Sequence, residues 1–170
     1  MSRFRTIIEA VEFLKLFNFS EYSVIEVCRQ YYFTRRERKV FDHYSLYLQG
    51  RTQAKIGYLM NMAQPAVSYM MKRCRTKIKI IGKLMKQAPD HLDIIKKECT
   101  PKAYEVLIEA LIGVKFIEIS RKRKCTVFNI SLICNGALRK LKKTYPDTFN
   151  WVFSLLRLIG TVRSNLPSQG

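Results

Sequence analysis

Apolar side chains recur along the first third of the chain at the spacing of an amphipathic helix. Residues 4–17 carry an apolar residue every three or four positions, and residues 20–32 repeat the pattern behind a serine suited to an N-cap. Thr34 and Glu37 then have the spacing of a capping box. We expect the helix that follows to end near Gly50, because glycine readily adopts the left-handed conformation found beyond helix C-termini. This region therefore predicts three helices.

The next segment predicts a short helix, a tight turn and a long basic helix. Thr52 is suited to cap the short helix, and residues 61–63 form the turn. The apolar residues of the short helix are Ile56, Leu59 and Met60. Pro65 lies in the first turn of the long helix, where its missing N–H costs little, and basic residues such as Lys77 cover much of that helix. The apolar stripe of the long helix consists of Val67, Met71, Cys74, Ile78, Ile81 and Met85. This stripe either faces the core or forms a seam between two copies of the chain.

The stretch KQAPDH (residues 86–91) predicts a break, because a proline inside a helix removes a backbone hydrogen bond. We therefore expect two domains, residues 1–88 and residues 89–170. The second domain is also mainly helical by its apolar spacing. Its expected helices cover residues 100–113, 134–144 and 148–160.

Residues 114–131, VKFIEISRKRKCTVFNIS, allow two interpretations. Their β-branched and aromatic residues flank the basic tetrapeptide RKRK, which is typical of a β-hairpin with a basic tip, like the wing of a winged helix. Alternatively, the second half is a degenerate second copy of the first, displaced by 63 residues. Four apolar pairs then coincide: Ile56 with Ile119, Val67 with Ile130, Met71 with Cys134 and Ile78 with Leu141. Against the copy, Lys122 and Arg123 would take the positions of Leu59 and Met60, which are predicted core residues.

The charge of the chain narrows the class of its partner. The 170 residues carry a formal net charge of +18. Two long runs contain no Asp or Glu: residues 43–89, with nine Lys and Arg, and residues 119–146, with eight. Repulsion among so many positive charges opposes folding into a compact chain unless an anionic polymer offsets it. Nucleic acid is the commonest partner of this kind, and an anionic membrane surface is the second.

Several classes of chemistry lack residues to support them. No nucleotide-binding loop, zinc-protease motif or nucleophile elbow occurs, so we expect no catalytic residues and no enzyme. The five cysteines include no C-x-x-C pair and the two histidines lack zinc-finger spacing, so we expect buried thiols, no metal and no cofactor. No stretch is long and apolar enough to span a membrane, and no secretion signal is recognisable. These features predict a cytoplasmic protein.

The segment RRERKVFDHYSLYLQGRTQAKIGYLMNMAQPAVSYMMKRCRTKI, within about residues 34–80, resembles a known DNA-binding unit. It is similar to the helix-turn-helix of the fourth region of bacterial sigma factors and of LuxR-type regulators. The shared pattern is E-R-x-V-F, a glycine, T-Q-x-x-I with hydrophobic positions after it, and a basic helix. Ala63 departs from the Ser or Thr that usually caps the third helix. The resemblance implies a mainly α fold built around a helix-turn-helix.

The resemblance also implies that residues 63–75 bind DNA. The residues toward the groove would be Gln64, Ser68, Tyr69, Lys72 and Arg73, several of which can bond to base edges, and Arg75 is a further candidate for contact with DNA. The residues toward the phosphates would be Arg51, Thr52, Gln53 and Lys55. Apart from the resemblance, the basic cluster Arg121, Lys122, Arg123 and Lys124 is a candidate for phosphate or minor-groove contact.

We therefore expect a mainly α-helical, nucleoid-associated regulator of transcription that binds double-stranded DNA, of a kind suited to a phage or mobile element. Two alternatives are an accessory factor of RNA polymerase and a nucleic-acid packaging or RNA-binding protein without sequence preference. A palindromic target would require a homodimer, for which the apolar helix at residues 148–160 is the candidate face. No membrane partner is expected.

Overall fold

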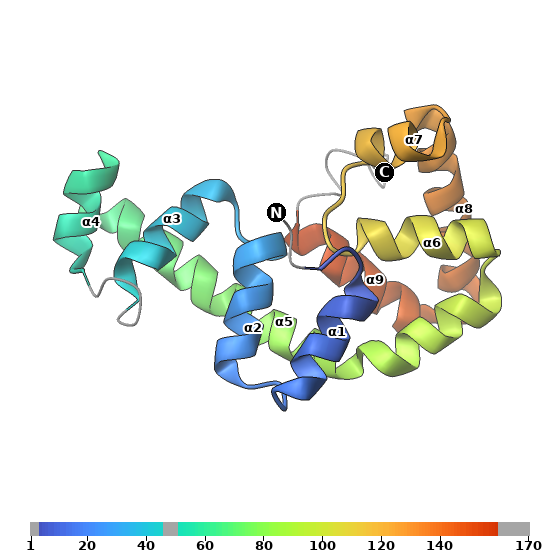
Figure 1. The fold of residues 1–170 in the computed structure, drawn as a ribbon, viewed down its shortest axis with the longest axis horizontal. Helices are drawn as coiled ribbons and strands as arrows, with labels where there is room; N and C mark the ends of the chain where they lie inside the picture. The colour runs from blue at the N-terminus through green and yellow to red at the C-terminus, as the bar shows by residue number, and fades with distance from the viewer. Residues whose placement is uncertain (1–3, 46–50, 160–170) are drawn as a thin grey trace.

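The computed structural model describes residues 4–45 and 51–159, and all regular structure in these ranges is helical (Figure 1). The prediction of a mainly α-helical chain is therefore confirmed, whereas the helix expected to run to near Gly50 ends at Tyr44, because Ser45 is extended; Gly50 itself lies outside the described residues. The elements are α1 (Ile7–Leu16), α2 (Glu21–Val27), the π-helical turn η1 (Cys28–Tyr32), α3 (Arg35–Tyr44), α4 (Gln53–Met60), α5 (Gln64–Glu98), α6 (Pro101–Ala110), α7 (Phe116–Arg123), α8 (Val127–Thr144) and α9 (Pro146–Leu158).

The first helices begin at hydroxyl side chains that the sequence marks as caps. Ser20 accepts a hydrogen bond from the Ser23 N–H at the start of α2. Thr34 and Glu37 form the predicted capping box of α3, since each side chain accepts a hydrogen bond from the backbone N–H of the other. Each cap satisfies a backbone donor that the helix leaves unpaired. Local sequence therefore decides where these helices start.

Helix α5 spans both halves of the chain. Its 35 residues run without interruption through Pro89, so the break predicted at residues 86–91 is wrong. The buried residues that continue its apolar stripe around and beyond the proline are Ala88, Leu92 and Ile95. Their burial offsets the hydrogen bond that proline removes. In Figure 1, α5 passes from α4 to α6 and curves along its length, as a proline inside a helix permits.

Residues 114–131 form α7 and the start of α8, so the predicted β-hairpin is wrong. Phe116 and Ile119 are buried, and their spacing of three places both on one face of a helix. The tetrapeptide RKRK is the last turn of α7 with its C-cap, Lys124, which adopts the left-handed conformation at φ 54°. β-Branched residues favour strands where a sheet offers them a surface to pack on. The described part of the chain contains no strand that would offer one.

The structure contains two helical corners of the same construction. The first corner is α4, the turn at residues 61–63 and the first turns of α5. The second corner is α7, the turn at residues 124–126 and the first turns of α8. Helices α4 and α7 are both 8 residues long. Each is followed by a left-handed residue, Asn61 or Lys124, with φ of 54° in both cases.

The correspondence between the corners extends to hydrogen bonds and buried side chains, at the same displacement of 63 residues. The equivalent hydrogen bonds join Met62 N–H to Gly57 O (2.8 Å) and Cys125 N–H to Ser120 O (3.0 Å). The equivalent buried pairs are Ile56 with Ile119, Val67 with Ile130 and Met71 with Cys134. Leu59 is 45% exposed, so its assignment to the core is wrong and Lys122 replaces no core residue. Met60 does pack against the core, and Arg123 takes its place with a guanidinium paired to Glu105 and Glu109. The backbone therefore favours the copy over the hairpin.

Helix α9 packs in the core against α5 and α8. Its buried apolar residues are Phe149, Trp151, Val152, Leu155 and Leu156. Trp151 Nε1 donates a hydrogen bond to the Leu84 carbonyl at 2.8 Å, and His91 Nδ1 lies 2.9 Å from Thr148 Oγ1. The choice of this helix as a dimer face is therefore wrong. The α5 stripe is likewise covered within the chain, which confirms the core interpretation over the seam.

The division into domains of residues 1–88 and 89–170 stays a prediction. Buried side chains from both halves belong to one apolar cluster. Helix α5 contributes to it along most of its length, and α1 and α2 of the first half pack on the same helix as α9 of the second. The two corners lie toward opposite ends of the longest axis of the molecule (Figure 1).

Candidate nucleic-acid interface

A close backbone approach holds α4 against α5 in the first corner. A Cβ atom on Gly57 would lie 2.6 Å from the carbonyl oxygen of Met62, closer than such atoms can approach. Thr52 Oγ1 accepts a hydrogen bond from the Lys55 N–H and starts α4. Asn61 ends the helix in the left-handed conformation, which asparagine tolerates better than most residues. This turn fixes how the two helices present their outer surfaces.

Three of the residues predicted to face DNA share one side of α5. Gln64, Ser68 and Lys72 are spaced four residues apart, so their side chains follow one another along the helix surface. Gln64 and Lys72 are exposed and Ser68 is half-buried. None of the three belongs to the buried stripe. This side of α5 offers an amide, a hydroxyl and an ammonium group to an external partner.

Arg73 is engaged within the chain. Its Nε lies 3.5 Å from Oε2 of Glu37, and its guanidinium carbon lies 5.8 Å from the centroid of the Tyr69 ring. The Tyr69 side chain remains 61% exposed. Any external anion that binds Arg73 must therefore compete with the Glu37 carboxylate.

Arg75 lies on the same side of α5 as Lys72, three residues before it, and not on the side of Arg73. Its guanidinium donates a hydrogen bond to the Tyr44 hydroxyl at 3.1 Å and lies over that ring. A separation of two residues rotates a side chain by about 200° around an α-helix. Arg75 therefore cannot share a face with Arg73, and the residues predicted over 63–75 do not form one surface.

The phosphate-contacting residues predicted around α4 differ in accessibility. Arg51 is half-buried and donates a hydrogen bond to the ring of His43. Gln53 is half-buried, and the hydroxyl of Thr52 serves as the α4 cap. Lys55 is exposed. Of the four, Lys55 presents its charge most openly to solvent.

Some residues of the basic cluster in the second half form ion pairs with α6, and others do not. Arg123 is largely buried, and its guanidinium lies 3.0 Å from Glu105 and 3.6 Å from Glu109. Lys122 lies 3.2 Å from Glu109, although 71% of its side chain is exposed. The exposed members that form no salt bridge within the described residues are Arg121 and Lys124. Arg123 therefore links α7 to α6, and the other three can meet a partner.

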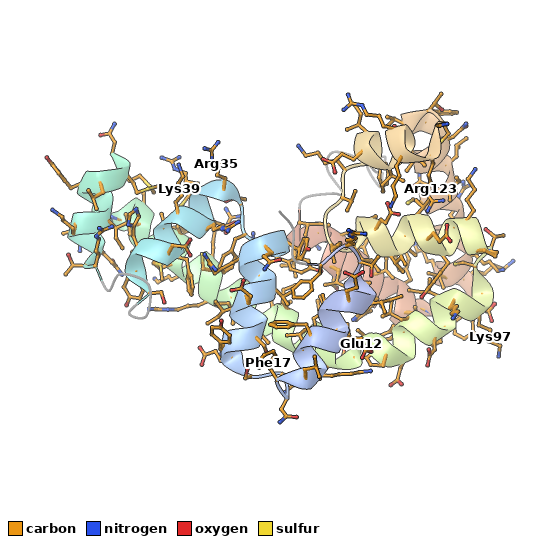
Figure 2. The ribbon with its side chains drawn as sticks, viewed as in Figure 1. Glu12, Phe17, Arg35, Lys39, Lys97 and Arg123 are labelled. Carbon is orange, nitrogen blue, oxygen red and sulfur yellow. The ribbon has the colours of Figure 1, made fainter. Side chains whose placement is uncertain are left out.

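Sequence reasoning missed a group of exposed cations next to the first corner. Figure 2 shows Arg35 and Lys39 projecting from the edge of α3. The exposed cations of α3 outside the predicted set are Arg35, Arg36, Arg38 and Lys39, and the basic side of α5 continues beyond the corner through the exposed Lys79, Lys83 and Lys86. The run TRRERK carried the signal for the α3 group, since four of its six residues are basic.

One lysine expected on the surface is buried with an acid. Lys77 Nζ lies 2.7 Å from Glu37 Oε1 and donates a second hydrogen bond to the Tyr32 carbonyl at 2.8 Å. Burial alone would raise the pKa of Glu37, but the hydrogen bonds from Lys77 and Thr34 outweigh it and hold the pKa below its ordinary value. The one acidic side chain in the TRRERK run is therefore ionised and compensated inside the protein.

The described residues show no group of three or more His, Cys, Asp or Glu side chains that could hold a metal ion. All five cysteines are free thiols; Cys28, Cys74 and Cys134 are buried as predicted, whereas Cys99 and Cys125 are half-buried. Burial raises the pKa of Cys74 and of Cys134 to about 12, which keeps both thiols protonated. Among the described helices, none combines the length and the apolar character needed to cross a membrane.

No family model, no curated protein and no solved structure matches this chain. The candidate interface therefore stands on the chemistry of its own residues. Two basic surfaces are available to a partner, one around each corner.

Proposed function

We propose that this chain binds double-stranded DNA through the first corner and regulates transcription from that position. The composition of the corner's outer surface carries the proposal. No residue from 43 to 89 is acidic, and the exposed lysines Lys72, Lys79 and Lys83 follow one another along α5. Solvated surfaces normally intersperse both signs of charge. A surface that carries only positive charge over so many residues is suited to binding a polyanion.

Most of the affinity would come from the phosphates. Each lysine or arginine that pairs with a phosphate releases condensed counterions, so binding weakens steeply as salt rises. Lys55 on α4 and the exposed cations of α3 belong to the two helices that pack on this part of α5, and they are the candidates for phosphate contact. In the first turn of α5, Pro65 has no N–H and the N–H groups of Ala66 and Val67 donate to the Ala63 carbonyl, so the Gln64 N–H is the backbone donor that remains for a phosphate.

Base reading would fall to the first turns of α5. The amide of Gln64 can bond bidentately to adenine, the ammonium of Lys72 can bond to guanine, and the hydroxyl of Ser68 can bond to either. Tyr69 adds an exposed ring beside them. This assignment leaves out Arg73 and Arg75, because their guanidinium groups already have partners on α3.

In its finer form, the proposal is a helix-turn-helix like that of sigma region four or LuxR-type regulators. An RNA polymerase accessory factor would use the same surface and would copurify with the polymerase. A packaging or RNA-binding protein would bind without sequence preference. These outcomes separate the three roles.

Selection of bound duplexes from a random pool, followed by affinity measurements across salt, tests the proposal. We expect an enriched motif and a steep negative slope of log affinity against log salt. Tight binding without a motif would favour packaging. No binding to duplex DNA at low salt would contradict the proposal as a whole.

Substitutions separate the predicted roles. Gln64→Ala should lower the preference for the selected motif over random DNA by about 1–3 kcal/mol. Lys55→Ala should weaken binding to the selected motif and to random DNA to a similar extent, because a phosphate contact carries no sequence information. Lys15→Ala is the matched control, since Lys15 is an exposed lysine in the last turn of α1 and belongs to neither corner. Equal behaviour of Gln64→Ala and Lys55→Ala would show that α5 is not the reading helix.

A further inference from the structure

The second corner repeats the backbone of the first but carries different chemistry on its outer face. The residues at the positions of Gln64 and Tyr69 are Val127 and Leu132, displaced by the same 63 residues. Val127 is 42% exposed, Leu132 is 48% exposed, and the neighbouring Phe128 is 70% exposed. Apolar side chains cannot form the paired hydrogen bonds that distinguish one base from another, although they can contact a thymine methyl group.

The surface around these apolar residues is basic. Arg121, Lys122 and Lys124 are exposed on and just after α7, and no acidic residue occurs between 119 and 146. The exposed cations of α8 are Arg139, Lys140, Lys142 and Lys143. The nearest acids on α6, Glu105 and Glu109, are paired with Arg123 and Lys122, and Glu118 on α7 is an exposed acid that the three exposed cations outnumber. The charge of the second corner therefore has the same sign as that of the first.

The spacing of the corners limits how both could meet DNA. They lie toward opposite ends of the longest axis (Figure 1). Helix α5 leads from the first corner to the second half, and its 35 residues correspond to about 52 Å at 1.5 Å per residue. One turn of the duplex spans roughly 34 Å. A chain that used both corners on one duplex would therefore contact two separate segments of it.

We infer that the second corner is a second DNA-binding surface, which anchors one chain to the phosphates of the same duplex at a segment separate from the one read by the first corner. This inference rests on the proposed function. The first corner recognises the base sequence, and the second corner binds the phosphates of any sequence. A single chain then covers a long site with an asymmetric motif and needs no symmetric partner.

Footprinting on the selected duplex tests the layout. One chain per duplex should protect two separated segments, and the enriched motif should lie in only one of them. Protection of the motif segment alone would overturn the inference while leaving the proposed function intact. Failure of the native chain to bind any duplex would instead overturn the proposed function.

A charge-matched pair of variants tests the residues. Arg121→Gln with Lys124→Gln should lower affinity for all duplexes alike, reduce the salt slope by about 0.9 for each lost phosphate contact, and leave the selected motif unchanged. Arg5→Gln with Lys15→Gln removes the same charge from exposed positions outside both corners and should leave the slope unchanged. Equal slopes for the two double variants would overturn the inference.

The apolar residues of α8 give a second check. Phe128→Ser with Leu132→Ser should leave the mass of the chain in solution unchanged, as measured by sedimentation, because the proposal makes this face a DNA contact. If the native chain sediments as a dimer and this variant as a monomer, the face joins two copies and the inference is overturned.

Discussion

Glu37 shows how one side chain serves both the fold and the surface. Its carboxylate accepts the Thr34 N–H as part of a capping box, pairs with the buried Lys77, and lies 3.5 Å from Arg73. Residues 38 and 39 beside it are exposed cations. A buried charge is tolerated only when it is paired and hydrogen-bonded. Glu37 is therefore the internal counterion that joins α3 to α5.

Glu37→Gln should destabilise the protein by roughly 3–5 kcal/mol, because it leaves the Lys77 ammonium buried without a carboxylate. Urea unfolding at pH 7 measures the change. Arg73→Gln is the control and should cost less than about 1 kcal/mol, since Arg73 is half-exposed and screened by solvent. Similar costs for the two variants would mean that the Lys77 pair contributes little.

The same pair gives a pH dependence of definite sign. The folded-state pKa of Glu37 is held below its ordinary value of 4.5, so the unfolded chain takes up the proton first as pH falls. The contribution to stability is complete above that value and is lost as pH falls through the lower folded pKa. The stability gap between the native chain and Glu37→Gln should therefore narrow below about pH 4.5. A gap that stayed constant down to pH 3 would contradict the assignment.

At the scale of elements, the two corners show what sequence patterns can and cannot decide. The caps at Thr34, Thr52 and Thr100 and the left-handed Gly113 were predictable, because each depends on residues within one turn of it. Residues 114–131 were not, because their β-branched content and their helical spacing point to different structures. The burial of Phe116 and Ile119 decided between them.

The first corner depends on a glycine for space. A Cβ on Gly57 would meet the Met62 carbonyl, whereas a Cβ on Gly136 would meet nothing within 4 Å. We expect Gly57→Ala to cost about 1–3 kcal/mol through overpacking. Gly136→Ala, inside α8, should stabilise the chain by about 0.5–1 kcal/mol, since alanine loses less backbone entropy than glycine. Thermal unfolding of the two variants checks both signs, and a stabilising Gly57→Ala would show that the turn at 61–63 yields easily.

For the whole molecule, charge and core act in opposite directions. Buried residues from both halves form one cluster, while the net charge of +18 repels itself across the surface. The exposed cations of α3 and α5 account for part of this repulsion. A polyanion that bound these cations would reduce their repulsion and would therefore stabilise the folded chain.

The melting temperature of the DNA-free chain should therefore rise with salt. Salt shortens the range of repulsion to about 10 Å at 0.1 M, and calorimetry from low to moderate sodium chloride measures the effect. Replacing Arg35, Arg36, Arg38 and Lys39 by Gln should raise the low-salt melting temperature and flatten its salt dependence. A native melting temperature that fell as salt rose would show that attractive pairs dominate the surface.

The sequence by itself determined the helical class, most helix starts, the alternation of α4, turn and α5, and the two acid-free runs, because these depend on spacing and composition. The likeness to sigma region four stays a prediction. Only the tertiary structure decided that α5 continues through Pro89, that α9 is core, and that Lys77 and Arg123 are internal partners of acids. It also decided that 114–131 repeats the first corner. The physical reason is the same for all of these. Each depends on which side chains from distant parts of the chain a residue contacts, and the local sequence pattern does not specify those contacts.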